Sequence, residues 1–452
     1  MRTPAADAQP LRAPLPEILG IAALEGRVAR SFPLLLACLL AIALLARVAI
    51  ALLAADIDPA TSDMFEYGAN AVLSLKHGAI VSDVLLADGR RFVYPTAFMP
   101  PLMIFFDMFW LWALGVSKVA LAAIIGCNIV FGTLICFYTA RIARTLFDSR
   151  VIALLAGLIV ALHPVFVYSV ATFHALNLYV LLLLVLFDLS SSRCRASPGN
   201  AIAVGVVLGV AVLARTEYLV LGPAIIATAA LRHRRVALVA LSLLVAALIV
   251  SPWTLRNYLV FQRFIPVVDS FGYNLCKSFN AETNGSGHWV DRNGVVDRVA
   301  GAQIAALPET PMYEVDRDAI YRAAARDYIR SHPWRSFVEL PIQKALLFWL
   351  FDIYDSTTHK LLYQLSLWPT ITLSLLGFVY AWRRGWSANP DLQMIVAYFA
   401  AQTLVIAAYS VHARYRTNVE PFLFCFAALG LLLLVKWLRA WRTAPRLARS
   451  PA

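Results

Sequence analysis

Apolar runs of roughly 20 residues, each long enough to cross a bilayer, recur along most of this 452-residue chain. Hydrophobic residues make up 60% of the chain and charged residues 15%, whereas soluble proteins average about 45–50% and about 25%. The chain is therefore not an ordinary soluble protein, and its 12% of aromatic residues excludes a disordered one. We predict an all-α polytopic membrane protein with candidate spans near 32–55, 117–139, 151–169, 173–189, 201–214, 217–231, 236–251, 361–382, 391–411 and 421–438.

Basic residues at the ends of these runs predict the topology, because cytoplasmic loops carry an excess of arginine and lysine. Two further apolar stretches, 98–115 and 337–354, decide the outcome. If both lie flat on the membrane, every major basic cluster falls on one side: Arg27/Arg30, Arg141/Arg144/Arg150, Arg193/Arg195, Arg232/Arg234/Arg235, Arg383/Arg384 and Arg439/Arg442/Arg446/Arg449. We therefore expect about ten spans, in-plane periplasmic helices and cytoplasmic termini. The net charge of +12 then reflects orientation and does not indicate nucleic-acid binding.

The composition of the two flat stretches agrees with this topology. The first opens with Pro100-Pro101 and carries Asp107, which would cost about 2.5–3.5 kcal/mol in mid-bilayer but stays in water on an interfacial helix. The second contains Glu339, Pro341, Lys344 and Asp352. The expected organisation is a cytoplasmic tail (1–31), a transmembrane core (32–251) with a first periplasmic loop (56–116), a large periplasmic loop region (252–360) with an amphipathic helix near 309–331, C-terminal transmembrane helices (361–438) and a basic cytoplasmic tail (439–452).

The segment Thr61–Tyr67 follows the outer end of the first span and offers a carboxylate at the bilayer surface. Asp63 in this position could act as a general base towards an acceptor hydroxyl or amine. The alternative is a capping role, in which Thr61, Ser62 or Asp63 starts a helix and Glu66 completes a capping box. Spacing alone leaves both open.

Several cations on the predicted outer side run against the charge bias: Arg215 beside Glu217, Arg256, and the pair Arg414 and Arg416. Guanidinium groups suit phosphate oxygens because they offer paired donors. The alternative for each is contact with lipid headgroups. Arg47, inside the first span, is expected to pair with a carboxylate or to extend towards the interface.

No pattern predicts a metal site or a cofactor, although a requirement for a divalent metal stays open. The six cysteines contain no CxxC pair. The histidines show no HxxxH or HExxH spacing. His163 and His174, which lie on either side of a predicted turn, are more typical of packing residues than of metal ligands.

Six motifs along the chain resemble, in their order, those of C-type integral-membrane glycosyltransferases of the protein O-mannosyltransferase and lipid A aminoarabinose transferase type. They are Asp63-x-x-x-Tyr67-x-x-x-Ala71 with Gly78; Tyr94-Pro95-Thr96-Ala97-x-x-Pro100-Pro101 with Gly115; Leu213-Ala214-Arg215-x-Glu217; Ser251-Pro252-Trp253-x-x-Arg256-Asn257-Tyr258-x-x-Phe261; Gly272-Tyr273-Asn274-Leu275; and Arg414-Tyr415-Arg416-x-x-x-x-Pro421. Two departures are Thr216, where proline is usual, and His174, where relatives often carry an acidic residue.

The resemblance implies an inverting glycosyltransferase that takes a sugar from a polyprenyl-phosphate donor and uses Asp63 as catalytic base. It further implies that Arg256, with Arg414 or Arg416, binds the donor phosphate. Candidate substrate-pocket residues are Glu66, Tyr67, Tyr94, Arg215, Glu217, His174 and Asn274. The acceptor is a glycan, lipid or protein, and the expected location is a bacterial inner membrane with the site facing the periplasm or exterior. The alternative function is a flippase or transporter of lipid-linked sugars.

Overall fold

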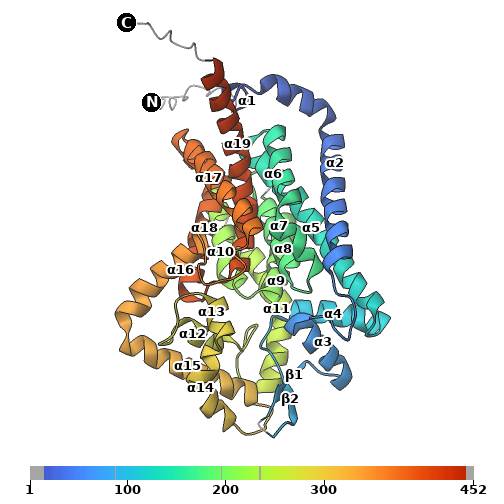
Figure 1. Cartoon of the computed structure of the whole chain (residues 1–452), viewed down its shortest axis with the longest axis vertical. Helices are drawn as coiled ribbons and strands as arrows, with labels where there is room; N and C mark the ends of the chain where they lie inside the picture. The colour runs from blue at the N-terminus through green and yellow to red at the C-terminus, as the bar shows by residue number, and fades with distance from the viewer. Residues whose placement is uncertain (1–14, 87, 195, 234–235, 444–452) are drawn as a thin grey trace.

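The computed structural model describes residues 15–86, 88–194, 196–233 and 236–443. The predicted tail residues 1–14 and 444–452 lie outside the described residues, as do Arg195, Arg234 and Arg235 of the basic clusters. Long helices run side by side along the molecule (Figure 1), and the two predicted loop regions gather at one end of this bundle, which we call the loop-bearing end. The helix α1 (Leu15–Ile18) and the last turns of α19 lie at the other end.

Among the described residues, six helices are long and apolar enough to cross a membrane. They are α2 (Ala22–Ala54), α5 (Lys118–Phe147), α11 (Val236–Phe261), α17 (Leu361–Arg383), α18 (Pro390–Ala408) and α19 (Glu420–Thr443). A bent pair adds a seventh, and shorter apolar helices stand beside them: α8 (Leu176–Ser190), α9 (Pro198–Ala214) and α10 (Tyr218–His233). The predicted polytopic helical fold is confirmed, while ten spans stay a prediction.

Arg47 supports the bend in that pair, where α6 (Arg150–Leu162) meets α7 (Pro164–Tyr168) and the short 3-10 helix η1 (Ser169–Ala171) at 59°. A proline cannot donate the helical hydrogen bond, so carbonyls of the preceding turn lose their partners. Arg47 is fully buried and donates to the carbonyls of Val160 and Ala161, both at 3.4 Å. Both sequence interpretations of Arg47 are therefore wrong, because the side chain binds backbone oxygens.

The first loop region contains α3 (Phe65–His77), the antiparallel hairpin of β1 (Val81–Leu85) and β2 (Arg91–Pro95), and α4 (Pro101–Leu114). The hairpin was not predicted. The helix α4 packs against α3 and α5 and buries Asp107 completely. The expectation that Asp107 stays in water is wrong: its carboxylate oxygens are buried and have no hydrogen-bond partner among the described residues.

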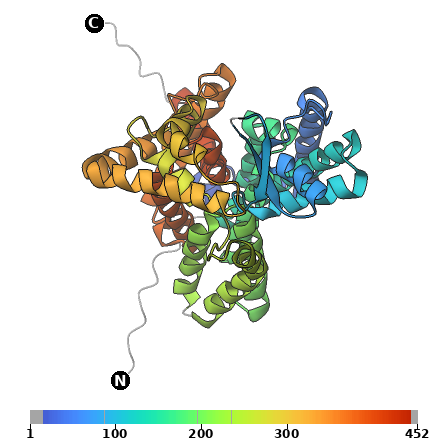
Figure 2. The same ribbon diagram turned by 90° about the horizontal axis from the view of Figure 1, so that it is seen from below.

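The second loop region carries α12 (Phe271–Ser278), α13 (Gly287–Arg292), α14 (Val295–Ala305), α15 (Tyr313–Ser331), a π-helix (Arg335–Glu339) and α16 (Leu340–Trp349). The helix predicted near 309–331 corresponds to α15. Because α11 continues to Phe261, the domain boundary predicted at 251 falls inside a helix. Figure 2, seen from the loop-bearing end, places the first loop region (blue) and α12–α16 (yellow to orange) on two sides of the bundle, with α9–α11 (green) on a third.

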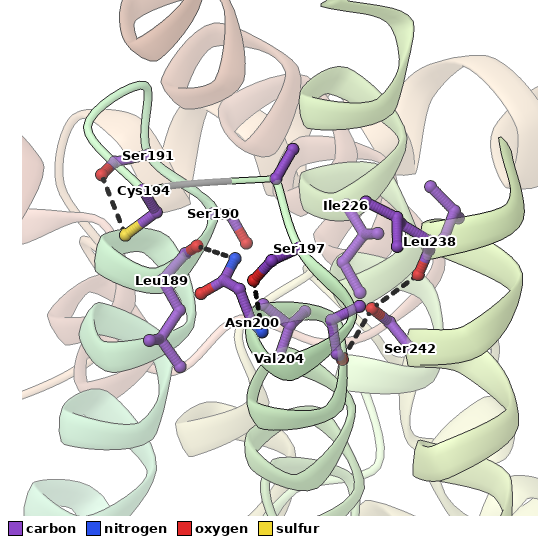
Figure 3. Close-up of a pocket in the computed structure, with 13 residues that line it drawn as sticks. Leu189, Ser190, Ser191, Cys194, Ser197, Asn200, Val204, Ile226, Leu238 and Ser242 are labelled. Carbon is purple, nitrogen blue, oxygen red and sulfur yellow. Dashed lines mark hydrogen bonds between the residues drawn. The ribbon is translucent and has the colours of Figure 1, made fainter. Parts of the chain in front are cut away.

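A small cavity of about 70 Å³ lies at the opposite end of the bundle, between α8, α9, α10 and α11 (Figure 3). Two of its polar side chains bind the protein backbone: Asn200 donates to the carbonyl of Leu189 at 3.0 Å, and the Ser242 hydroxyl donates to that of Ala201 at 2.9 Å. Ligand sites usually measure about 300–1,000 Å³, so this space is too small for a sugar substrate.

Candidate functional site

A cavity of about 820 Å³ opens at the loop-bearing end, where the two loop regions meet the ends of the long helices. Such a volume accommodates a substrate of the size of a sugar phosphate. Its lining is rich in aromatic and charged side chains, which include Phe65, Glu66, Tyr67, Phe98, His174, Tyr179, Arg215, Glu217, Tyr273, Asn274, Lys277, Asp291, Asp297, Arg414 and Tyr415.

The start of α3 presents one carboxylate to this cavity and keeps another at its edge. Asp63 is exposed, does not line the cavity, and accepts a hydrogen bond from the Phe65 N–H at 3.0 Å. Phe65 has a φ of 58°, a left-handed conformation that is costly for a bulky side chain. Such strain is typical of functional segments. Glu66 and Tyr67, immediately after this turn, line the cavity.

Glu66 is exposed to the open cavity but surrounded by protein. Burial raises the pKa of its carboxyl, and the positive charges of Arg414 and Lys277 partly oppose that rise. No capping hydrogen bond joins Glu66 to the start of α3 in the described structure. The carboxylate is therefore free to meet a ligand.

His174 supplies a neutral ring to the same wall. It lies 4.8 Å from the Phe65 ring and 6.3 Å from the Tyr67 ring, both edge to face. Burial, with the nearby Arg414 and Arg215, lowers the pKa of His174 to about 3, so the imidazole stays uncharged at neutral pH. Across the described residues, no group of three His, Cys, Asp or Glu side chains is placed to hold a metal ion.

Arg215 and Glu217 form a rigid, neutral pair in the cavity wall. The guanidinium lies between the rings of Tyr179 and Tyr415, at 4.4 and 4.7 Å, and contacts Glu217 at 2.5 Å. Asn418 donates a further hydrogen bond to Glu217 at 2.8 Å. With its charge balanced by Glu217, Arg215 is suited to holding the wall in place.

Arg414 differs from the other two predicted phosphate ligands, Arg256 and Arg416, because its guanidinium has no hydrogen-bond or ion-pair partner among the described residues. Its side chain is exposed within the cavity lining and lies over the rings of Phe65 and Tyr415, 5.8 Å from the centre of each. An unpaired guanidinium in a cavity is a ready ligand for a phosphate group.

Arg256 and Arg416 do not line the cavity. Arg256 donates to the carbonyls of Thr96 and Ile80, both at 2.9 Å, and so joins α11 to the first loop region. Arg416 is buried and donates to the carbonyls of Trp349 and Leu350, both at 3.0 Å, at the end of α16. These guanidinium groups hold helices together around the site.

The remaining predicted pocket residues divide in the same way. Asn274 lines the cavity and donates to the Ser270 carbonyl at 2.8 Å. Tyr94 lies outside it, with its ring 5.0 Å from that of Tyr313 and its hydroxyl 3.3 Å from Arg317. Of the eleven site residues predicted from the sequence, the structure brings seven together in the lining: Glu66, Tyr67, His174, Arg215, Glu217, Asn274 and Arg414. Asp63, Tyr94, Arg256 and Arg416 are not among the lining residues.

A buried carboxylate connects the two loop regions behind the cavity wall. Glu314 of α15 accepts hydrogen bonds from the Thr96 hydroxyl and the Ala97 N–H, both at 2.6 Å. Burial raises the pKa of Glu314 to about 7. Because the next residues, 98–100, line the cavity, this link fixes the position of that wall.

Sequence reasoning missed a second cation in the lining, Lys277. Its ammonium lies 2.5 Å from Asp291 and 3.1 Å from His412. These partners are 14 and 135 residues away along the chain. Long separations leave no local pattern, so only the three-dimensional structure identifies this group.

Residues 100–255 match the family model described as dolichyl-phosphate-mannose-protein mannosyltransferase. No curated protein matches the chain. The fold is similar to that of the Archaeoglobus fulgidus oligosaccharyltransferase solved with a tethered acceptor peptide, with a TM-score of 0.54, 13% identity and coverage of 90% of this chain and 50% of that one. The fold is also similar to that of the archaeal oligosaccharyltransferase AglB from Archaeoglobus fulgidus in complex with an inhibitory peptide and a dolichol-phosphate, with a TM-score of 0.55, 14% identity and coverage of 90% of this chain and 51% of that one.

ArnT from Cupriavidus metallidurans bound to undecaprenyl phosphate gives a TM-score of 0.40 and 14% identity over 90% of this chain and 79% of that one. This chain spans about half the length of the oligosaccharyltransferase. The family match over residues 100–255, together with the fold shared with the oligosaccharyltransferase, confirms the resemblance to C-type integral-membrane glycosyltransferases that the motifs predicted.

Proposed function

We propose that this protein is an inverting glycosyltransferase that moves a sugar from a polyprenyl-phosphate donor to an acceptor at the periplasmic face of a bacterial inner membrane. The observation that carries the proposal is the cavity itself, which holds an unpaired cation, Arg414, together with the carboxylate-bearing start of α3. The dolichol-phosphate and the peptide bound to AglB support the same two classes of ligand.

An apolar groove beside the cavity supports a lipid-linked donor. It measures about 510 Å³ and is formed by side chains of α9, α10 and α11. Leu219 lines both the groove and the cavity, so the two spaces are neighbours. We propose that the polyprenyl chain lies along this groove, which would bring its phosphate to the cavity.

The reaction is a single displacement at the anomeric carbon of the sugar. The acceptor atom forms a bond to this carbon while the bond to the lipid-phosphate oxygen breaks, and the phosphate keeps the electron pair. Asp63 takes the acceptor proton as general base, with Glu66 next to the reacting groups. Arg414 meets the negative charge that grows on the leaving phosphate.

Transfer of radiolabelled sugar from polyprenyl-phosphate donors tests the proposal in membranes that contain the protein. We expect labelled product with the wild type and none with a D63N/E66Q double variant at equal abundance. The double variant makes the test independent of which carboxylate takes the proton. Absence of product with every donor, together with label that crosses the membrane, would favour a transporter instead.

A further inference from the structure

Lys277 is a buried cation whose surroundings resemble a prepared ligand site. It lies in the last turn of α12, and its side chain is only 7% exposed. The ammonium contacts Asp291 of α13 at 2.5 Å and the Nε2 atom of His412 at 3.1 Å, while the residue lines the large cavity. Three separate segments of the chain therefore converge on one nitrogen atom.

The ammonium group of a lysine carries three N–H donors. Asp291 and His412 accept two of them. The third finds no acceptor within the part of the chain that the structure describes, although Lys277 faces the cavity. A desolvated donor left unpaired costs about 1–3 kcal/mol, so an incoming acceptor at this point is favoured.

His412 acts as an acceptor because its ring is neutral. Burial, followed by the charge of Lys277, holds the pKa of His412 well below its usual range. The proton then resides on Nδ1, and the Nε2 lone pair faces the lysine. A Cβ on residue 287 would overlap the imidazole, so the glycine there leaves room for this contact.

Lys277 and Arg414 act in the same part of the cavity. Both line it, and both influence the carboxyl of Glu66 electrostatically. The chain also connects them. His412, which contacts the Lys277 ammonium, precedes Arg414 by only two residues. In the same segment, the Val411 N–H donates to the Gly285 carbonyl at 2.9 Å. The unpaired donor of Lys277 and the unpaired guanidinium of Arg414 thus offer two positive groups to one ligand.

We propose that Lys277, oriented by His412 and Asp291, is a second ligand of the lipid phosphate beside Arg414. This inference rests on the proposed function and assigns a phosphate-binding residue that the motifs do not contain. When the glycosidic bond breaks, the phosphate gains one negative charge. A second cation that is already in position stabilises this charge without rearrangement of the protein.

Phosphate-dependent stabilisation of the purified full-length protein in detergent tests the inference. Undecaprenyl phosphate is the probe, undecaprenol is the control without phosphate, and the shift in Tm is the readout. We expect K277M to need about 10- to 100-fold more undecaprenyl phosphate than the wild type for the same shift, as is usual for a lost charged hydrogen bond. K118M is the matched control, because Lys118 pairs with Asp58 and does not line the cavity.

The outcomes separate the inference from the proposed function. If R414M loses the shift while K277M responds like the wild type, the role of Lys277 is wrong and the lipid-phosphate donor stands. If the wild type responds equally to both lipids, both proposals fail. If K277M does not fold, G287A and K277R replace it. Displacement of His412 in G287A should weaken the response and K277R should restore part of it, so a wild-type response in G287A would overturn the inference.

Discussion

The cavity has two walls of different charge, built in different ways. The acidic wall, which is Glu66 in the lining with Asp63 at the edge of the cavity, is set by a strained turn within a few residues of sequence. The basic wall, Lys277 and Arg414, depends on contacts between distant segments. A displacement reaction that releases a proton on one side and gathers negative charge on the other needs this polarity. The comparison teaches that the two halves of the proposed chemistry should respond differently to substitution.

Substitutions in the acidic wall should cause the largest loss of activity. General-base catalysis contributes about 10²- to 10⁴-fold, so we expect D63N to lower kcat by that amount with a small change in the KM of the donor. Loss of Glu66 in E66Q should cost about tenfold, as expected for a neighbour that orients the acceptor by one hydrogen bond. Steady-state kinetics of both variants at saturating donor provide the measurement. A larger loss in E66Q than in D63N would make Glu66 the base, consistent with its place in the cavity lining.

Substitutions in the basic wall should cause the next largest loss of activity. Removal of one preorganised donor to a developing charge costs about 10²- to 10³-fold, which we expect for kcat/KM in R414M. R256M should lose less activity and should lower Tm instead, because Arg256 donates to two carbonyls of the first loop region. Donor titrations with parallel thermal unfolding measure both quantities. Equal kinetic losses in the two variants would mean that Arg256 also reaches the phosphate.

The sequence contains enough information to predict the helical bundle and half of the site. Long apolar runs impose helices, and the motif around Asp63 lies next to the residues that enter the cavity. It does not distinguish Arg414 from Arg416, because two residues along a 3-10 turn separate an open cavity from a buried helix end. The prediction for Asp107 fails for a related reason: the sequence predicts a helix there, but not that this helix packs against α3 and α5 with Asp107 buried.

Loss of the hydrogen bonds that Glu314 makes to residues 96 and 97 should have the next largest effect, on Tm and on KM. E314A leaves the Thr96 hydroxyl and the Ala97 N–H buried without their acceptor. Each such loss costs about 1–3 kcal/mol, so we expect a clear fall in Tm and a rise in KM as residues 98–100 shift. E314Q keeps one acceptor oxygen and should recover part of both. Unchanged kinetics in folded E314A would show that the wall at 98–100 does not depend on this link.

The smallest expected effect is a change in the pH dependence of stability, which also comes from the carboxyl of Glu314. Burial raises the pKa of Glu314 from 4.5 to about 7, so the folded protein binds this proton more tightly than the unfolded chain does. Stability from this group is complete at low pH and decreases as pH rises from about 4.5 to about 7. Asp269, whose pKa burial raises from 3.8 to about 6, contributes with the same sign over a lower range. E314Q should therefore flatten the decrease of Tm between pH 6 and 7, where Asp269 contributes least, and keep the decrease below pH 6. Arg256, Arg317 and Tyr94 also surround Glu314, but they titrate well above this window. A slope that persists in E314Q up to pH 7 would therefore come from another titratable group, either a carboxyl or a histidine.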